Sequence, residues 1–558
     1  MRFNIKLSLV LCAAVLALTP ACGDPSAIEG SDFPAGANNG GNNGFNGANN
    51  GANNGANNGD WGNNGSNNGE DWGNNGANNG GGNNGVGEPD NGGQQPNDPN
   101  AELPDERPAE AWTDTAEDNL ATFSIDVDTA SYTSARRTIG QDGRLPHPAA
   151  VRVEEFINFF DYQYEAPAPL APEPFAIHVE SAPSPFGAEK HLVKVGIKGM
   201  EVPDEDRPAT NLVFLIDVSG SMLSEEKLPL VKYSLTTLLT ALRPQDTLGI
   251  VVYAGRQAVL LEPTRVEDRG DIQTAIESLR AGGSTNGAGG IRTAYELAQS
   301  AFVEGGINRV VLCTDGDFNV GVTGESLVQL VESWRDRDIT LTVLGYGGGF
   351  NDSFLEELTN RGNGNYAFID SRNEALRVLG DKLISTLQVI AKDVKIQVEL
   401  DADSIARYRL IGYSNRLIAD DDFRDDTVDA GEIGSGHEVT AFLEVEFHDG
   451  VSAGDAEGAL GTIYVRHKKP DEDVAAEVAL PLTLEEMGTD LDAASHHFRF
   501  AAAVAEFGEI LAESTFAEGG DLAAVLALAE GSLGEEAPAD RLEFLELVSR
   551  AQELSPRD

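Results

Sequence analysis

The chain has 558 residues, 41% of them hydrophobic, which is enough apolar material for more than one folded domain. Its 39 basic and 91 acidic residues give a formal net charge of −52, so we expect neither nucleic acid nor an anionic membrane surface as a partner. Divalent cations and basic proteins remain as expected partners, and adaptation to a salty habitat is the alternative reason for such a composition.

The first 22 residues predict a secretory signal. A basic start precedes the apolar run from Leu7 to Leu18, and the segment Ala21-Cys22-Gly23 follows it. This ending resembles the signal of bacterial lipoproteins, which implies lipidation at Cys22; ordinary cleavage and release is the alternative. No other apolar run reaches the roughly 18 residues that a membrane-spanning helix needs. We therefore expect an exported protein that contacts a membrane only through its lipid anchor.

Residues 23–118 are predicted to be a disordered linker. Asn-Gly repeats fill most of the stretch from Gly36 to Asn100, and their apolar surface is too small to offset the entropy of folding. Roughly sixty residues of glycine-rich coil have an r.m.s. reach of about 40 Å. The linker would hold the globular part away from the membrane.

Residues 119–205 are predicted to form an N-terminal α+β module. The stretch VRVEEFINFFDYQY predicts an amphipathic helix, and HLVKVGIKGM (191–200) alternates as a strand does. The helix would place four apolar residues on one face: Val153, Phe156, Ile157 and Phe160. Asp126 and Asp128 imitate a metal-binding loop, but without distal partners they are assigned to turn and capping chemistry.

Residues 206–390 alternate between apolar strands and helices, which predicts a doubly wound, mostly parallel sheet covered on both faces. Strands are expected at 211–216, 246–255, near Val259, at 308–314 and at 339–347. Helices are expected at 225–242, 271–279, 290–302 and 326–335, and around Phe354 and Leu376.

The stretch NLVFLIDVSGSM, from Asn211 to Met222, is the organising motif of this region. A buried strand delivers Asp217, Ser219 and Ser221 onto the turn that follows it. One carboxylate and two hydroxyls on alternate residues suit a small hard cation. The alternative is a helix N-cap, a position that Asp and Ser commonly fill.

Two later stretches complete the pattern. AGGSTNGAGG (281–290) offers Thr285, and VVLCTDGD (310–317) presents Asp315 at the end of a second buried strand. With the first motif, they resemble the metal-ion-dependent adhesion site of the von Willebrand factor type A (VWA) domain, a Rossmann-like fold. The resemblance implies that Asp217, Ser219, Ser221, Thr285 and Asp315 hold one divalent cation. We expect Mg²⁺, with Ca²⁺ and Mn²⁺ as alternatives, and we expect Ser284 to be a loop residue.

The resemblance extends from about Asn119 to the C-terminus. Segments such as FSIDVDTASY, VRVEEFINFFDY, GGINRVVLCTDGDFNVG and YRLIGYSNR are similar to a bacterial envelope family with a central VWA domain, labelled calcium-activated chloride channel homologues. The chain lacks the HExxH motif of a zinc protease and a spanning segment for a pore.

Residues 391–558 are predicted to form a β-rich domain that ends in helices. Alternating strands such as VKIQVEL and EVTAFLEVEF suggest a β-sandwich, and AASHHFRFAAAVAEFGEILAES suggests a helix. The acidic run from Asp420 to Asp426 is interpreted as a solvated loop, since it lacks a glycine-centred pattern of alternating ligands.

These features predict a non-enzymatic protein of the cell envelope, anchored by lipid at the bacterial outer membrane or cell surface. It would bind an acidic group of a protein partner through the metal. The alternative is a structural scaffold in which the metal only stabilises the fold. A hydrolase is the third reading, but Ser219 or Ser221 would need a base, no His lies between His191 and His437, and GxSxG is absent.

Overall fold

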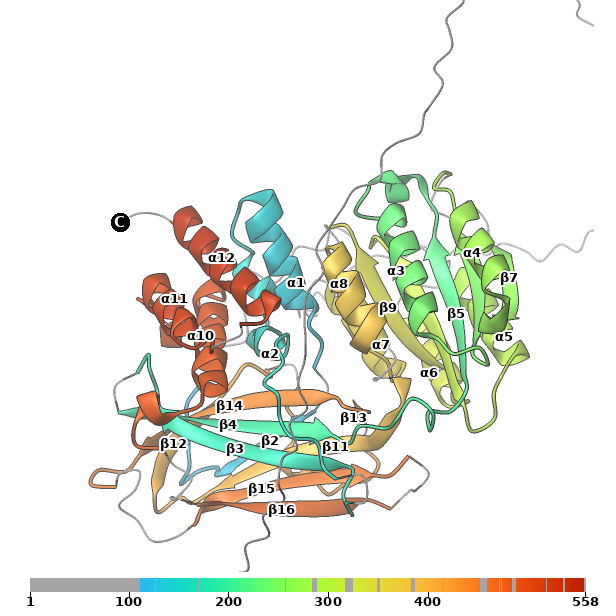
Figure 1. Cartoon of the computed structure of the whole chain (residues 1–558). Helices are drawn as coiled ribbons and strands as arrows, with labels where there is room; N and C mark the ends of the chain where they lie inside the picture. Colours follow the sequence, from blue (N-terminus) through green and yellow to red (C-terminus); the bar gives the residue numbers. More distant parts are fainter. Residues whose placement is uncertain are drawn as a thin grey trace, which may run out of the picture. The chain divides into compact units, whose positions relative to one another are not determined.

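The computed structural model describes residues 111–555, apart from residues 126, 169–170, 188, 256, 284–288, 317–324, 349–351, 383–386, 415, 429, 452–458, 471, 473, 484–487, 518 and 535–536 (Figure 1). All of these belong to one unit of the chain, Asp90–Asp558. The predicted signal, Cys22 and the Asn-Gly repeats lie outside the described residues.

The centre of the VWA region is a six-stranded sheet in the order β10-β9-β8-β5-β6-β7. All neighbouring strands are parallel except β6 and β7, which pair antiparallel at one edge. The predicted mostly parallel sheet is therefore confirmed. The strands are β5 (Thr210–Asp217), β6 (Thr247–Tyr253), β7 (Gln257–Arg265), β8 (Ile307–Thr314), β9 (Thr340–Tyr346) and β10 (Tyr366–Ile369).

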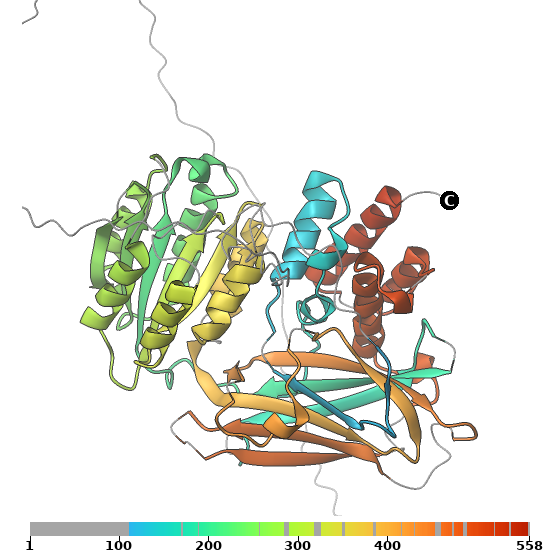
Figure 2. The same cartoon turned by 180° about the vertical axis from the view of Figure 1, so that it is seen from behind.

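Helices cover both faces of this sheet, as the two opposite views show (Figures 1 and 2). Leu212, Phe214 and Ile216 of β5 pack into one core with α3, α4 and α8, whereas Val213 and Leu215 pack into another with α5, α6 and α7. Because side chains alternate along a strand, burial of both faces requires an uninterrupted apolar run. The helices are α3 (Leu228–Ala241), α4 (Arg269–Ser278), α5 (Gly290–Ser300), α6 (Glu325–Arg335), α7 (Asp352–Arg361) and α8 (Arg372–Leu376).

Several elements differ from the predicted bounds. Helix α3 begins at Leu228 rather than at Glu225, and Pro229 lies in its first turn, where a missing N–H does no harm. The strand expected near Val259 is nine residues long, Gln257–Arg265. Helix α2 covers only Val153–Ile157, so the long amphipathic helix predicted there is wrong. Its apolar residues and Phe160 still share one core, because the chain stays packed after the helix ends.

Strands that precede the VWA region in the sequence and strands that follow it together form a β-sandwich. One sheet has the order β1-β12-β14-β4-β3, and the other has the order β13-β11-β15-β16 with β2 also paired to β11. Apolar side chains of both sheets form one core. The strands are β1 (Thr113–Asp114), β2 (Leu120–Ser124), β3 (Phe175–Pro183), β4 (Lys190–Gly199), β11 (Val389–Leu400), β12 (Ile405–Ile411), β13 (Gly431–Gly434), β14 (Glu438–Phe447), β15 (Ala459–Lys468) and β16 (Ala476–Thr483).

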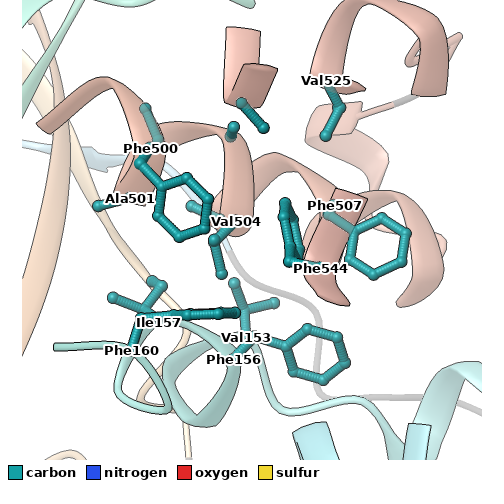
Figure 3. Packing of buried hydrophobic residues seen from close by; sticks show 14 of the residues in the cluster. Val153, Phe156, Ile157, Phe160, Phe500, Ala501, Val504, Phe507, Val525 and Phe544 are labelled. Atoms are coloured by element: carbon teal, nitrogen blue, oxygen red, sulfur yellow. The ribbon is translucent and has the colours of Figure 1, made fainter. Parts of the chain in front are cut away.

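The segments before and after the VWA region also contribute helices to one common layer. Helices α10 (His496–Leu511), α11 (Leu522–Glu530) and α12 (Ala539–Leu554) pack with α1 (Ala130–Arg137) and α2 around one aromatic core. Figure 3 shows Phe160, Phe500, Phe507 and Phe544 at its centre. The N-terminal and C-terminal segments therefore share both a sandwich and a helical core.

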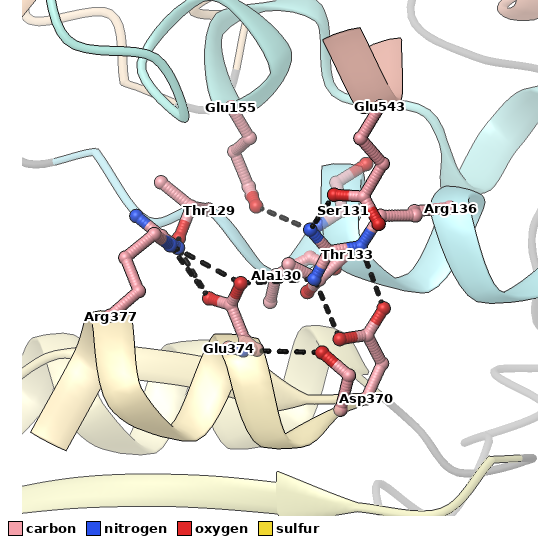
Figure 4. Close-up of polar contacts among 11 residues, drawn as sticks. Thr129, Ala130, Ser131, Thr133, Arg136, Glu155, Asp370, Glu374, Arg377 and Glu543 are labelled. Atoms are coloured by element: carbon pink, nitrogen blue, oxygen red, sulfur yellow. Dashed lines mark hydrogen bonds and ion pairs between the residues drawn. The ribbon is translucent and has the colours of Figure 1, made fainter. Parts of the chain in front are cut away.

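Buried ion pairs connect the helical layer to the VWA region (Figure 4). Arg136 of α1 donates to both carboxylate oxygens of Asp370, at 2.8 and 2.6 Å, and to Glu374 of α8 at 2.9 Å. Its third partner is Glu543 of α12, at 3.0 Å. Nearby, Asp128 accepts from the backbone N–H of Tyr366 in β10. Asp128, which we assigned to a turn or cap, thus also binds the VWA sheet, and Asp126 lies outside the described residues.

Candidate metal site

Strand β5 ends at the first candidate ligand, Asp217, which is fully buried, as is Ser219. The backbone N–H of Ser219 donates to Asp217 Oδ1 at 2.7 Å, and this bond closes the turn. The hydroxyls of Ser219 and Ser221 lie 2.8 Å apart. One carboxylate and two hydroxyls therefore converge at the carboxyl end of a central strand, where ligands of open α/β sheets bind.

The glycine-rich loop that contains Thr285 starts beside this turn. The backbone N–H of Gly220 donates to Gly283 O at 3.1 Å, and that of Gly282 donates to Val218 O at 2.8 Å. Gly283 has φ +104°, a conformation that a side chain would strain. Ser284 and Thr285 themselves lie outside the described residues, so the role of Thr285 stays a prediction.

Asp315 directly follows β8, the parallel neighbour of β5. It is 7% exposed, and its Oδ2 accepts a hydrogen bond from Lys227 Nζ at 2.9 Å. At this edge of the sheet, two buried carboxylate oxygens have no hydrogen-bond partner among the described residues: Asp217 Oδ2 and Asp315 Oδ1. Buried polar atoms are nearly always hydrogen-bonded, so two such oxygens at one sheet edge indicate a place for a cation.

Burial raises the pKa values of two residues at this edge of the sheet, Asp217 and Cys313. It raises the pKa of Asp217 to about 6; the bonds from Ser219 lower this pKa, and the charge of Asp315 raises it. Burial likewise raises the pKa of the Cys313 thiol, so Cys313 is a small buried apolar residue, as its place in β8 predicts, and not a thiolate nucleophile.

The donor set fits a hard divalent cation. Carboxylate and hydroxyl oxygens are the ligands that Mg²⁺ accepts, and Mg²⁺ keeps several waters. Among the described residues, no group of three or more His, Cys, Asp or Glu side chains is placed so that it could hold a metal. A zinc site built from such a group is therefore excluded in that part of the chain. The candidate set has only two carboxylates, so the hydroxyls would have to supply the other protein ligands.

The N-cap alternative for the motif is not supported. Ser219 precedes a short 3-10 turn, Gly220–Leu223, but its side chain makes no capping bond there. Helix α3 begins at Leu228, well beyond Ser221. The Ser219 hydroxyl is directed instead toward Ser221.

Sequence reasoning missed one member of this site, Lys227. Its ammonium reaches Asp315 from the residue just before α3. Lysines on helices are usually solvated, so the sequence alone contains no signal that separates this one from others. The pairing depends on how α3 is placed beside the end of β8.

Comparisons with known proteins identify the domain and the family. Residues 211–382 match a model of the von Willebrand factor type A domain, residues 101–194 match a model described as von Willebrand factor, and residues 385–554 match the C-terminal region of the uncharacterized protein YfbK. The YfbK protein of Escherichia coli (strain K12) is 38% identical over 457 residues, which cover 78% of each chain. The chain belongs to the YfbK family. It is thus a bacterial VWA-domain protein, and the predicted fold class is confirmed.

Other similarities of this YfbK-family protein are more distant. Inter-alpha-trypsin inhibitor heavy chain H4 of Bos taurus is 29% identical over 157 residues, which are 26% of this chain and 17% of that protein. A solved structure of a von Willebrand factor type A protein from Catenulispora acidiphila is 15% identical, with a TM-score of 0.40, and the match covers 72% of this chain and 99% of that one. In the described part of the chain every helix is too short or too polar to pass through a lipid bilayer.

Proposed function

We propose that this YfbK-family protein is a non-enzymatic receptor of the cell envelope that binds an acidic group of a protein partner through a divalent cation. Asp217, Ser219, Ser221, Thr285 and Asp315 would hold the ion, with Mg²⁺ preferred. VWA domains generally mediate protein–protein interactions, often with a metal, and this chain has that domain at 211–382. The observation that carries the proposal is the pair of unpartnered buried oxygens, Asp217 Oδ2 and Asp315 Oδ1, beside two converging hydroxyls.

The chemistry of such a site favours capture over catalysis. A cation held mainly by neutral hydroxyls stays electrophilic and supplies an open position for an incoming carboxylate. The protein's own residues supply orientation, because the Ser219 N–H fixes Asp217 and the loop bonds of Gly220 and Gly282 fix the turn. The net charge of −52 opposes an acidic partner, but salt limits this repulsion to about 8 Å.

Affinity capture from solubilised envelopes tests the proposal. We expect the protein to retain a partner in Mg²⁺ and to lose it in EDTA, and we expect Asp217→Ala to lose it in both, because that change removes the central carboxylate. Asp271→Ala, which alters an exposed carboxylate of α4, is the matched control and should behave as the parent. Partners that are retained regardless of metal and of Asp217 would contradict the proposal.

The structural-scaffold alternative makes a different prediction for the same proteins. If the ion only stabilises the fold, EDTA should lower the melting temperature sharply and the bound partners should be lost only with unfolding. Circular dichroism of the parent and of Asp217→Ala in EDTA separates the two cases.

Export and lipid anchoring are a second part of the proposal, supported by the lipoprotein-like segment Ala21-Cys22-Gly23. We expect Cys22→Ala to move the protein from the detergent phase to the aqueous phase in Triton X-114 partition, because the acyl chains supply the membrane affinity. Cys313→Ala, which changes the buried cysteine of β8, is the control. A Cys22→Ala protein that stays in the detergent phase would contradict lipidation at this residue.

A further inference from the structure

The ammonium of Lys227 already occupies part of the candidate metal site. Its Nζ donates to Asp315 Oδ2 at 2.9 Å, and the side chains of Lys227 and Asp315 are 18% and 2% exposed. The aliphatic stem lies against Gly347, where a Cβ atom would come within 2.4 Å of Lys227 Cε. The glycine after β9 thus leaves room for a lysine that crosses to the end of β8.

We propose that Lys227 is a built-in competitor of the metal: its ammonium pairs with Asp315 in the metal-free site and must leave when a divalent cation binds. This inference rests on the proposed function. Asp315 is one of the predicted ligands, and a cation at its free Oδ1 would lie close to a second positive charge in a largely buried place, where like charges repel strongly. One of the two cations therefore has to move.

Lysine is suited to this exchange. Its charge is compact and strongly hydrated, and it sits at the end of a flexible stem of four methylene groups. The side chain makes no capping bond to α3, so it can swing outward without disturbing the helix. Its partial exposure gives it a path to solvent. Metal-free protein would keep the Asp315 carboxylate paired with Lys227, and metal would bind more weakly than the oxygen ligands alone allow.

The ion can bind only to molecules in which Lys227 has left Asp315. The apparent affinity of the site is therefore its intrinsic affinity multiplied by the fraction of such molecules. If about one molecule in ten is free, removing the ammonium tightens metal binding about tenfold. The same change should lower the melting temperature of the metal-free protein, since Asp315 loses its ion pair with Lys227. The gap between metal-loaded and metal-free melting temperatures should widen.

The test is calorimetric titration of the full chain with Mg²⁺. We expect Lys227→Met and Lys227→Gln to bind Mg²⁺ about tenfold more tightly than the parent. Lys232→Met is the matched control, because Lys232 lies in the helix that follows Lys227 but donates to the carbonyl oxygens of Glu277 and Leu279. It should bind as the parent does. Asp217→Ala should not bind.

A second measurement needs no substitution at Lys227. In the parent protein, Mg²⁺ should increase the rate at which an N-hydroxysuccinimide ester acylates Lys227, read by mass spectrometry, because the freed amine becomes accessible. The acylation of Lys232 should not change.

The outcomes distinguish this inference from the proposed function. Unchanged or weaker Mg²⁺ binding by both Lys227 variants, or slower acylation in Mg²⁺, would overturn the role of Lys227 and leave the metal site in place. A parent protein that does not bind Mg²⁺, or an Asp217→Ala variant that binds it equally, would overturn both.

Discussion

Replacing Arg136 with methionine is expected to lower the free energy of unfolding by about 3–5 kcal/mol, because it removes the guanidinium group that pairs with buried carboxylates. Arg136 forms two hydrogen bonds to Asp370 and one to Glu374, whose side chains are 3% and 1% exposed (Figure 4). Burial alone would raise the pKa of Glu374, but Arg377 and Arg136 lower it, so the ionised Glu374 carboxylate depends on these guanidinium groups. Urea unfolding at neutral pH, followed by circular dichroism, measures the loss.

The matched control is Arg550→Met in α12, which removes an exposed ion pair with Glu553 and should change stability by less than about 1 kcal/mol. Hydrogen exchange should also accelerate in α1 of the Arg136 variant, since the cluster joins α1 to the end of β10. An Arg136→Met protein as stable as the parent would contradict a stabilising role for this ion-pair cluster.

Replacing Phe544 with alanine is expected to lower the free energy of unfolding by about 3–5 kcal/mol through the cavity it leaves. Phe544 is fully buried, and its ring centroid lies 5.5 Å from that of Phe160 and 5.4 Å from those of Phe500 and Phe507 (Figure 3). Two helices, α10 and α12, and the segment after α2 meet at this ring, so the surrounding side chains cannot easily close the space. Urea unfolding measures the effect.

Leu542→Ala provides the control within the same helix, because Leu542 is 46% exposed and its truncation should cost no more than about 0.5 kcal/mol. If the two truncations have equal effects, the helical layer does not contribute a cooperative core. A selective loss of α10–α12 protection in hydrogen exchange, without a change in the VWA sheet, would place the unfolding in this layer alone.

The central sheet could be predicted because each of its strands carries its own signal. Five apolar residues in a row at Leu212–Ile216 require burial on both faces, and the helices between strands require parallel crossovers. Strand partners in the sandwich could not be predicted. The alternation in β14 indicates a strand but says nothing about which strand lies beside it.

The site was predictable only in part. Asp217, Ser219, Ser221 and Asp315 follow strands whose ends must meet at one edge of the sheet, so the sequence places them near each other. Lys227 comes from the start of a helix, and its reach to Asp315 depends on packing that no local pattern encodes. The short α2 was missed for a similar reason, since an apolar periodicity persists in Phe159 and Phe160 after the helix has ended.

The pairing of β2 with β11 also determines how late in synthesis the sandwich can form. Ser124 lies opposite Lys395, about 270 residues later, so at about 5–20 residues per second the first strand waits roughly 15–50 s for its neighbour to be synthesised. During that interval the VWA sheet, whose strands all fall between Thr210 and Ile369, can form by itself. The early strands meanwhile present unpaired edges, which are prone to aggregate. Strands β2 and β4 therefore have edges that can pair only after β11 and β14 have been synthesised.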